Sequence, residues 1–544
     1  MRWGSRQRLA AGGLILLACG ALLRRGAVEP VGSRACLPTA EQLPGRYHPV
    51  RSWPPAAPVR VSWKFPKAGS ADVTALFRTY PLTDEMMDRA LHRGSQWARR
   101  PVWRVMDRLA SDQALRVVVF GGSEAAGTGC DDGTLRYAGC SWSSRFVMWL
   151  RLAFPHARIT YENYAAGGTT TAGILPALRT ILATGPEPDL ILVDFLVNDA
   201  FEAQDWLASR GGAYANEEQE EIMRKGGHSR LEIVQAATAI LLSRLREYAP
   251  SAATILFEPL CTVRGAIARV DPRVCYETQD AHVAAADVFG VPVVSYRDVV
   301  WPASQLPEPP DDRFWCCNDT GHPRWEAHQL MADVMVHTWS EMRAEVCTPQ
   351  GPAFAPAPRL ESIVSPDLLE RFDQCRTPLT VHDAKAAAAK SGPDLADTHW
   401  RLGEDAPGKP GWIASEHGGS AASDRGLRFD LEFGASPRVI FSFLRSYEGQ
   451  GSVELTFETA EDRGGSRKEL VVDGLWPEGT MPAGSAGRVS QTHTLALNVQ
   501  QAEIQQRHGD AGIAGFGIKP HSKATLVVTI KRSGHFRVVS VVSC

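Results

Sequence analysis

The sequence predicts an α/β domain with a doubly wound, mostly parallel five-stranded sheet, followed by an all-β sandwich domain. Two observations carry this prediction. Between residues 111 and 346, short continuous apolar runs alternate with amphipathic segments of helical length, which is typical of a buried parallel sheet covered by helices. After residue 400 the pattern changes to a period of two interrupted by turn residues, as in antiparallel sandwiches.

The length of 544 residues and the composition indicate a globular protein with several domains. Hydrophobic residues make up 44% of the chain and charged residues 22%, so we expect packed cores and exclude global disorder. The 58 Lys and Arg residues nearly balance the 61 Asp and Glu residues, which gives a formal net charge of −3. Because a chain with this charge balance does not attract polyanions electrostatically, we expect no nucleic-acid partner. Its function then has to come from local sites.

Residues 1–25 predict a signal peptide or a signal anchor. Arginines precede the apolar run Leu9–Leu23, and Arg24 and Arg25 follow it directly. This run fits the apolar core of a signal peptide and is shorter than the ~20 residues usual for a spanning helix. Cleavage at the small-residue pattern Ala18-Cys19-Gly20 and retention as an anchor are both open. Either one places the rest of the chain in the secretory pathway, secreted or anchored on the lumenal or extracellular side, with membrane contact only through this segment.

The cysteines agree with that compartment. The chain has 11 cysteines, and Cys19 lies within the apolar N-terminal run, which leaves an even number for the rest. None has the C-x-x-C spacing of zinc or haem sites, so disulfides in an oxidising compartment are the preferred interpretation. Cys130 and Cys140 are one candidate pair, although sequence alone leaves the connectivity open.

The predicted elements of the first domain follow an irregular lead-in. Residues 26–110 are rich in Pro, Arg and Trp and contain one helical pattern at Thr83–Leu109. The predicted strands of the domain at residues 111–346 are the apolar runs Leu115–Phe120, Arg158–Tyr161, Asp189–Leu196, Ala253–Phe257 and Val291–Ser295. The predicted helices are Ser141–Phe154, Ala172–Ala183, Ser229–Tyr248, Asp280–Val288 and a last helix from about Pro323 to Met342.

Residues 347–399 predict a linker rich in Pro and Ala, and residues 400–544 predict the β-sandwich, an accessory domain of about seven short strands. Its clearest alternating runs are Leu427–Phe433, Val439–Leu444, Val453–Phe457, Thr494–Val499, Thr525–Ile530 and Phe536–Val542. The aromatic residues of these runs are interpreted as core rather than as a platform for stacking sugars.

Small and polar residues follow three of the predicted strands. Ser123 lies in a Gly-rich turn after the first strand, where the backbone can bend sharply and expose a hydroxyl. The pair Gly167-Gly168 follows the second strand and leaves backbone N–H groups open to an oxyanion, and Asn198 after the third strand can donate a further hydrogen bond. Because parallel strands place ligands at their carboxyl ends, we expect these residues to lie close together.

A fourth motif, Asn318–His328, leads into the last helix. Asp319 and His322 are three residues apart, so one tight turn can bring the carboxylate to imidazole Nδ1 and direct Nε2 toward Ser123. Taken alone, each of the four motifs also fits an ordinary turn or helix cap.

In this order the four motifs resemble the SGNH hydrolases, also called GDSL-like esterases, over about residues 116–342. The resemblance implies Ser123 as nucleophile, His322 as general base and Asp319 as the residue that orients the base. It also implies an oxyanion hole formed by the Ser123 amide, Gly168 and Asn198.

Two details of the resemblance concern single positions. Gly168 is preferred over Gly167 because it lies five residues after Asn163, as in the second motif of the family. The family usually has Gly-Asp-Ser at the nucleophile, whereas this chain has Gly122 in place of the Asp. We expect that loss of side-chain hydrogen bonds to loosen the turn without removing a member of the triad.

The resemblance implies hydrolysis of small acyl esters through an acyl-enzyme, with no metal or organic cofactor. The expected substrate is an acylated small molecule or, by analogy with the family and the appended domain, an acylated carbohydrate or glycoconjugate. Two alternatives stay open. One is an O-acyltransferase in which a sugar hydroxyl replaces water, and the other is a non-catalytic adhesion or binding protein with a relic SGNH domain. The complete set of motifs argues against the second.

Overall fold

The computed structural model describes residues 82–91, 97–131, 139–183, 185–200, 229–260, 272–304, 322–346, 359–372, 375, 378–384, 395, 398–404, 410–414, 426–446, 449–459, 469–475, 491–499, 516–532 and 534–544. The predicted signal segment at residues 1–25 and the candidate Asp319 lie outside the described residues. Among the helices within these ranges, none is both long enough and apolar enough to span a bilayer.

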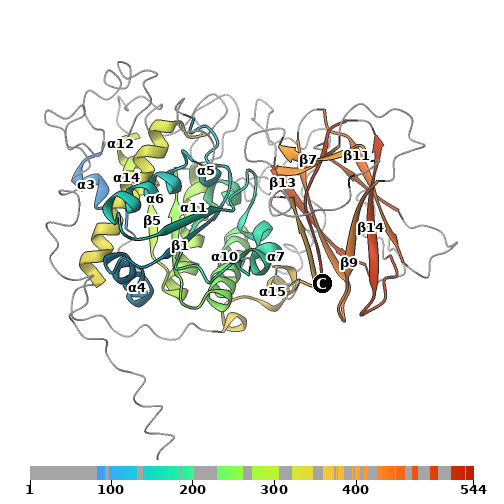
Figure 1. Cartoon of the computed structure of the whole chain (residues 1–544), viewed down its shortest axis with the longest axis horizontal. Helices are drawn as coiled ribbons and strands as arrows, with labels where there is room; N and C mark the ends of the chain where they lie inside the picture. Colours follow the sequence, from blue (N-terminus) through green and yellow to red (C-terminus); the bar gives the residue numbers. More distant parts are fainter. Residues whose placement is uncertain are drawn as a thin grey trace, which may run out of the picture.

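Five parallel strands form the sheet of the first domain, in the order β2-β1-β3-β4-β5 (Figure 1). The strands are β1 (Leu115–Gly121), β2 (Ile159–Asn163), β3 (Leu190–Asp194), β4 (Ala253–Glu258) and β5 (Val293–Ser295). Strand β1 pairs with both β2 and β3, so the order of the strands reverses at β1. This topology confirms the predicted doubly wound sheet. Open α/β sheets generally bind ligands at the carboxyl ends of the strands where the order reverses.

Helices cover both faces of this sheet, because alternate residues of each buried strand point to opposite sides. Val117 and Val119 of β1 pack in one core with the helices of one face, and Val118 and Phe120 pack in a second core with the helices of the other. The first core contains α4 (Arg99–Ala110), α6 (Trp142–Ala153) and α14 (Trp325–Val346). The second contains α7 (Thr171–Leu182), α10 (Arg230–Tyr248) and α11 (Pro272–Phe289).

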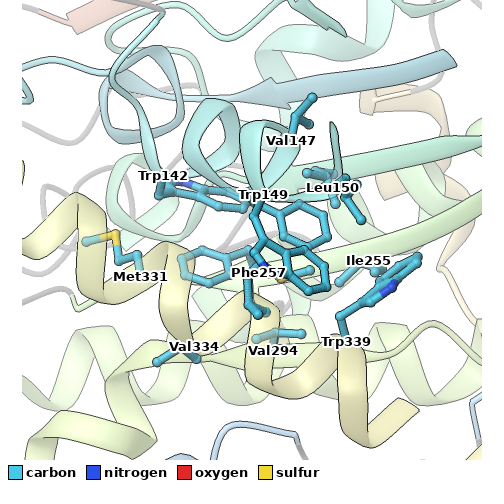
Figure 2. Packing of buried hydrophobic residues seen from close by; sticks show 14 of the residues in the cluster. Trp142, Val147, Trp149, Leu150, Ile255, Phe257, Val294, Met331, Val334 and Trp339 are labelled. Carbon is cyan, nitrogen blue, oxygen red and sulfur yellow. The ribbon is translucent and has the colours of Figure 1, made fainter. Parts of the chain in front are cut away.

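Large aromatic side chains fill the first core between α6, α14 and the sheet (Figure 2). The rings of Trp142 and Phe257 stack with their centroids 4.0 Å apart, and Trp339 packs edge-on against Phe146 at 5.7 Å. Burying one such side chain stabilises a fold by about 1.5–3 kcal/mol. The Trp142 contact fixes the beginning of α6 against the carboxyl-terminal half of β4.

Part of the predicted linker at residues 347–399 packs on the first domain. The short helices η3 (Leu360–Ser362) and α15 (Pro366–Phe372) contact α10, and Leu360 and Leu368 belong to the second core. A further segment of that range, β6 (Thr380–Asp383), pairs with the last strand of the chain.

The second domain is a sandwich of two antiparallel sheets (Figure 1). One sheet has the order β13-β10-β15-β8-β7, with β6 also paired to β15, and the other has the order β12-β11-β14-β9. Their bounds are β7 (Trp400–Glu404), β8 (Pro410–Ala414), β9 (Leu427–Glu432), β10 (Arg438–Arg445), β11 (Ser452–Glu458), β12 (Glu469–Asp473), β13 (Gln491–Asn498), β14 (Lys523–Arg532) and β15 (Phe536–Ser543). Phe429, Phe441, Phe443 and Trp412 are buried between the sheets, as the core interpretation of the aromatic residues predicts.

Two disulfides are present within the described residues. Cys130 and Cys140 are bonded, with their Cα atoms 5.5 Å apart, so the candidate pair of the sequence is formed. Cys375 and Cys544 are bonded at a Cα distance of 5.6 Å, which attaches the segment after α15 to the end of the chain.

Candidate active site

Ser123 lies at the sharp turn between β1 and a short helix, α5 (Ser123–Ala126). The turn is closed by backbone hydrogen bonds: the Gly122 N–H donates to Asp194 O at 2.9 Å, and the Ala126 N–H donates to Gly122 O at 3.0 Å. The Thr128 N–H donates to Ser123 O at 2.9 Å, and Ser123 retains 8% of its surface exposed. The backbone therefore holds this strand–turn–helix without a side chain at position 122.

The absence of a side chain at Gly122 has a steric reason. A Cβ atom built on Gly122 would lie 1.8 Å from Asn198 Nδ2, which is far inside van der Waals contact. The amide of Asn198 thus occupies the space that a side chain at position 122 would need. The expected loosening of the turn stays a prediction.

The loop after β2 lies beside the same turn. The Ala166 N–H donates to Gly121 O at 3.0 Å, which ties the loop to the end of β1. Asn163 donates from Nδ2 to Ala125 O at 2.8 Å and accepts from the Ala165 N–H at 2.9 Å, so it bridges α5 and the loop. Gly168 has φ of 83°, a left-handed conformation that favours glycine over residues with a side chain.

Asn198 lies in the helical turn that follows β3 and is 8% exposed. Its side-chain contact with Gly122 places its amide next to the Ser123 turn. The structure therefore brings Ser123, the Gly168 loop and Asn198 together at the carboxyl ends of neighbouring strands, as the sequence predicts. Their catalytic roles stay predictions.

The predicted base, His322, precedes α14 and is half-buried, whereas its predicted partner Asp319 lies outside the described residues. A second histidine, His328, lies within α14 and is fully buried. Burial lowers the pKa of His328 to about 3, and its Nδ1 accepts a hydrogen bond from the Trp142 N–H at 3.2 Å. His328 is thus a neutral side chain that anchors the beginning of α6. The role of His322 as general base stays a prediction.

Two buried carboxyl groups lie next to the Ser123 turn, and nothing in the local sequence marks them as a pair. Glu124 follows Ser123 directly, and Asp194 ends β3 and accepts a hydrogen bond from Trp142 Nε1 at 2.9 Å. Burial raises the pKa of Asp194 to about 7. Burial also raises the pKa of Glu124, and the nearby charge of Asp194 adds to this effect. The low-dielectric surroundings therefore favour the neutral form of these groups.

The second domain reaches the candidate site. Thr492 of β13 donates from Oγ1 to Gly167 O at 3.4 Å, and β13 also contacts α7. Figure 1 shows β13 at the side of the sandwich that faces the first domain. The loop that carries Gly168 therefore lies between the sheet of one domain and a strand of the other.

No protein-family model matches the sequence, and no curated protein matches it. Among solved structures, a two-domain esterase (CEX) active on acetylated mannans is similar over 84% of this chain and 97% of its own, with 16% identity and a TM-score of 0.46. A candidate GDSL-like lipase from Parabacteroides merdae is similar over 42% of this chain and 95% of its own, with 19% identity and a TM-score of 0.31. A lipase/acylhydrolase from Enterococcus faecalis is similar over 44% of this chain and 99% of its own, with 15% identity and a TM-score of 0.28.

Proposed function

We propose that the chain is an SGNH-type serine esterase that hydrolyses small acyl esters through an acyl-enzyme on Ser123. The observation that supports this proposal is the position of Ser123 at the strand–turn–helix after β1, with the Asn198 amide against the preceding Gly122. A serine at such a turn is suited to nucleophilic attack, and an adjacent side-chain amide is suited to stabilising an oxyanion.

In the proposed reaction, His322 takes the proton of Ser123 Oγ as the oxygen attacks the ester carbonyl, and Asp319 orients the imidazole. The tetrahedral oxyanion accepts hydrogen bonds from the Ser123 and Gly168 amides and from Asn198. The C–O bond to the leaving alcohol then breaks, and the alcohol takes the proton from His322. Water, deprotonated by the same histidine, hydrolyses the acyl-enzyme and restores Ser123.

We place the substrate among acylated carbohydrates. The second domain contacts the Gly167 carbonyl through Thr492, so a polymeric substrate bound at Ser123 lies within reach of both domains. Acetylated mannan, on which the two-domain esterase acts, and acetylated xylan are suitable test polymers. Release of acetate from either polymer is the expected result, whereas acetyl transfer to an added sugar would identify the O-acyltransferase alternative.

We also propose that the chain works in the secretory pathway or outside the cell, as a secreted or membrane-anchored protein. The bonded pairs Cys130–Cys140 and Cys375–Cys544 support an oxidising compartment. Cell fractionation tests this proposal. Recovery of the protein from the medium indicates a cleaved signal, whereas recovery from the membrane fraction indicates an anchor.

The decisive experiment compares the full chain with Ser123→Ala. A fluorophosphonate probe and p-nitrophenyl acetate report covalent labelling and turnover, and we expect both to disappear in the variant. Ser362→Ala is the matched control, because Ser362 is an exposed serine whose Oγ bonds only the local Arg359 carbonyl among the described contacts. Equal labelling and turnover in wild type and Ser123→Ala would contradict the proposed function.

A further inference from the structure

A buried chain of three ionisable side chains lies beside the candidate oxyanion hole. His282, in the middle of α11, contacts Asp199 Oδ2 through Nε2 at 3.0 Å and Glu258 Oε1 through Nδ1 at 2.9 Å. Asp199 follows Asn198 directly, and Glu258 is the last residue of β4. All three side chains are buried, with residue exposures of 4% for Asp199, 1% for Glu258 and 2% for His282.

Both ring nitrogens of His282 face carboxyl oxygens. An imidazole between two ionised carboxylates donates from both nitrogens and carries a positive charge, because a carboxylate only accepts hydrogen bonds. Burial by itself lowers the pKa of His282, but the charge of Glu258 and the hydrogen bonds to Asp199 and Glu258 outweigh this effect and raise the pKa to about 10. The contacts at both ring nitrogens hold His282 between two carboxyl groups, which fixes the orientation of Asp199.

The other side of Asp199 holds the loop that carries Gly168. Asp199 Oδ1 accepts a hydrogen bond from the Thr171 N–H at 2.8 Å, and its Oδ2 accepts one from the Thr171 hydroxyl. Thr171 is the first residue of α7 and follows Gly168 by three positions. A carboxylate at this place satisfies an N–H that has no partner within the helix and is favoured by the helix dipole.

We propose that Asp199, held by His282 and Glu258, is a positioning residue that sets the geometry of the oxyanion hole by joining the Gly168 loop to the Asn198 turn. This role rests on the proposed function, because Gly168 and Asn198 are the two donors that the esterase reaction needs. Donors of an oxyanion hole act within about 2.7–3.1 Å of the developing charge, so a small shift of one donor against the other weakens them. The network restrains such a shift because one carboxylate contacts both segments.

The test measures kcat and KM for p-nitrophenyl acetate in the full-chain variants Asp199→Asn and His282→Gln. Asp199→Asn keeps an acceptor for the Thr171 N–H but loses the charge that pairs with His282. We expect kcat to fall about 10–100-fold, the range for a misplaced catalytic group, while KM stays near the wild-type value. The affinity for a boronic acid, which forms a tetrahedral adduct on the nucleophile, is expected to fall in parallel with kcat.

Asp189→Asn is the matched control. Asp189 Oδ2 accepts a hydrogen bond from the Arg116 N–H at 2.8 Å, and its Oδ1 pairs with Arg108 at 2.7 Å. Like Asp199, Asp189 accepts a backbone hydrogen bond and pairs with a second ionisable side chain. It precedes β3 and therefore lies at the amino ends of the strands, away from the candidate site. We expect Asp189→Asn to keep the wild-type kcat.

The outcomes separate this role from the proposed function. Wild-type kcat in folded Asp199→Asn or His282→Gln, with Ser123→Ala inactive, would overturn only the positioning role. An equal loss of kcat in Asp189→Asn would overturn it as well, because the effect would then be one of general stability. Full activity of Ser123→Ala would overturn the esterase proposal and this inference together. If Asp199→Asn does not fold, His282→Gln decides the question.

Discussion

The side-chain amide of Asn198 occupies the space that a Cβ atom on Gly122 would need, since that atom would lie 1.8 Å from Nδ2. The two residues come from different loops, after β3 and after β1 respectively, and meet beside Ser123. Position 122 must therefore lack a side chain while Asn198 keeps this conformation. The glycine at position 122 and the position of the proposed oxyanion donor are therefore linked.

We predict that Gly122→Ala and Gly122→Asp lower kcat for p-nitrophenyl acetate by more than about tenfold, because the new Cβ displaces the Asn198 amide from the oxyanion hole. The amide is the far end of a flexible side chain, so it can move at small cost to stability, and the melting temperature is expected to change little. Activity is therefore affected more than folding.

Gly434→Ala provides the control for this substitution. A Cβ at Gly434 would find its nearest neighbours at 3.7 Å, an ordinary contact, and the residue lies in the sandwich. Wild-type kcat in Gly122→Ala, in a protein that folds as well as Gly434→Ala, would contradict the role given to the Asn198 amide.

A second prediction concerns Gly168, whose φ of 83° is unfavourable for a residue with a side chain. Gly168→Ala is expected to cost about 1–2 kcal/mol of stability and, in addition, to lower kcat, because the strained peptide no longer directs its N–H to the oxyanion. Gly517→Ala is the comparison, since Gly517 has φ of 71° and no atom within 4 Å of an added Cβ. Similar losses of melting temperature with a loss of kcat only in Gly168→Ala would support the assignment. Equal kcat values in both variants would refute it.

The strands of the first domain could be predicted because a parallel sheet buried on both faces requires continuous apolar runs. The predicted run Asp189–Leu196 extends two residues beyond β3, since the apolar residues after Asp194 belong to the following turn and helix. In the sandwich, β8 (Pro410–Ala414) escaped prediction because it begins with Pro and Gly, which weaken a strand signal.

Some residues around the candidate site could also be predicted from the sequence, and others could not. Ser123 and Asn198 were predictable because each follows a recognisable strand. His282 was not, because its partner Asp199 is 83 residues away in sequence and the contact exists only once α11 packs on the sheet. Likewise, only the structure shows that Asn198 fills the space above Gly122.

A third prediction follows from Asp194. Its folded pKa of about 7 lies above its ordinary value of 3.8 because of burial. A group whose pKa is raised by folding contributes its full stabilisation at pH values below its unfolded pKa. This stabilisation is lost as the pH rises through the folded pKa. Asp194→Asn can still accept the hydrogen bond from Trp142 Nε1 but cannot ionise. We therefore expect its melting temperature to exceed that of the wild type at pH 8, by an amount that disappears near pH 4. A destabilisation that is the same at both pH values would contradict this account of the buried carboxyl.

The last prediction concerns the stability of the wild type in alkaline solution. The folded pKa of His282 is about 10, above its ordinary value of 6.5, because Glu258 and Asp199 outweigh the effect of burial. Burial raises the pKa of Glu258, and the charge of Arg297 acts in the opposite direction. The stabilisation from His282 is therefore complete below about pH 6.5 and is lost as the pH rises through the folded pKa. In His282→Gln this dependence is absent, so the difference in unfolding free energy between the variant and the wild type is expected to shrink from pH 7 to pH 10.

Denaturant unfolding at pH 7, 8.5 and 10 measures this difference. His382→Gln is the control, because His382 contacts a backbone carbonyl instead of two carboxylates. A difference that stays constant across this range would show that His282 is not held as an imidazolium.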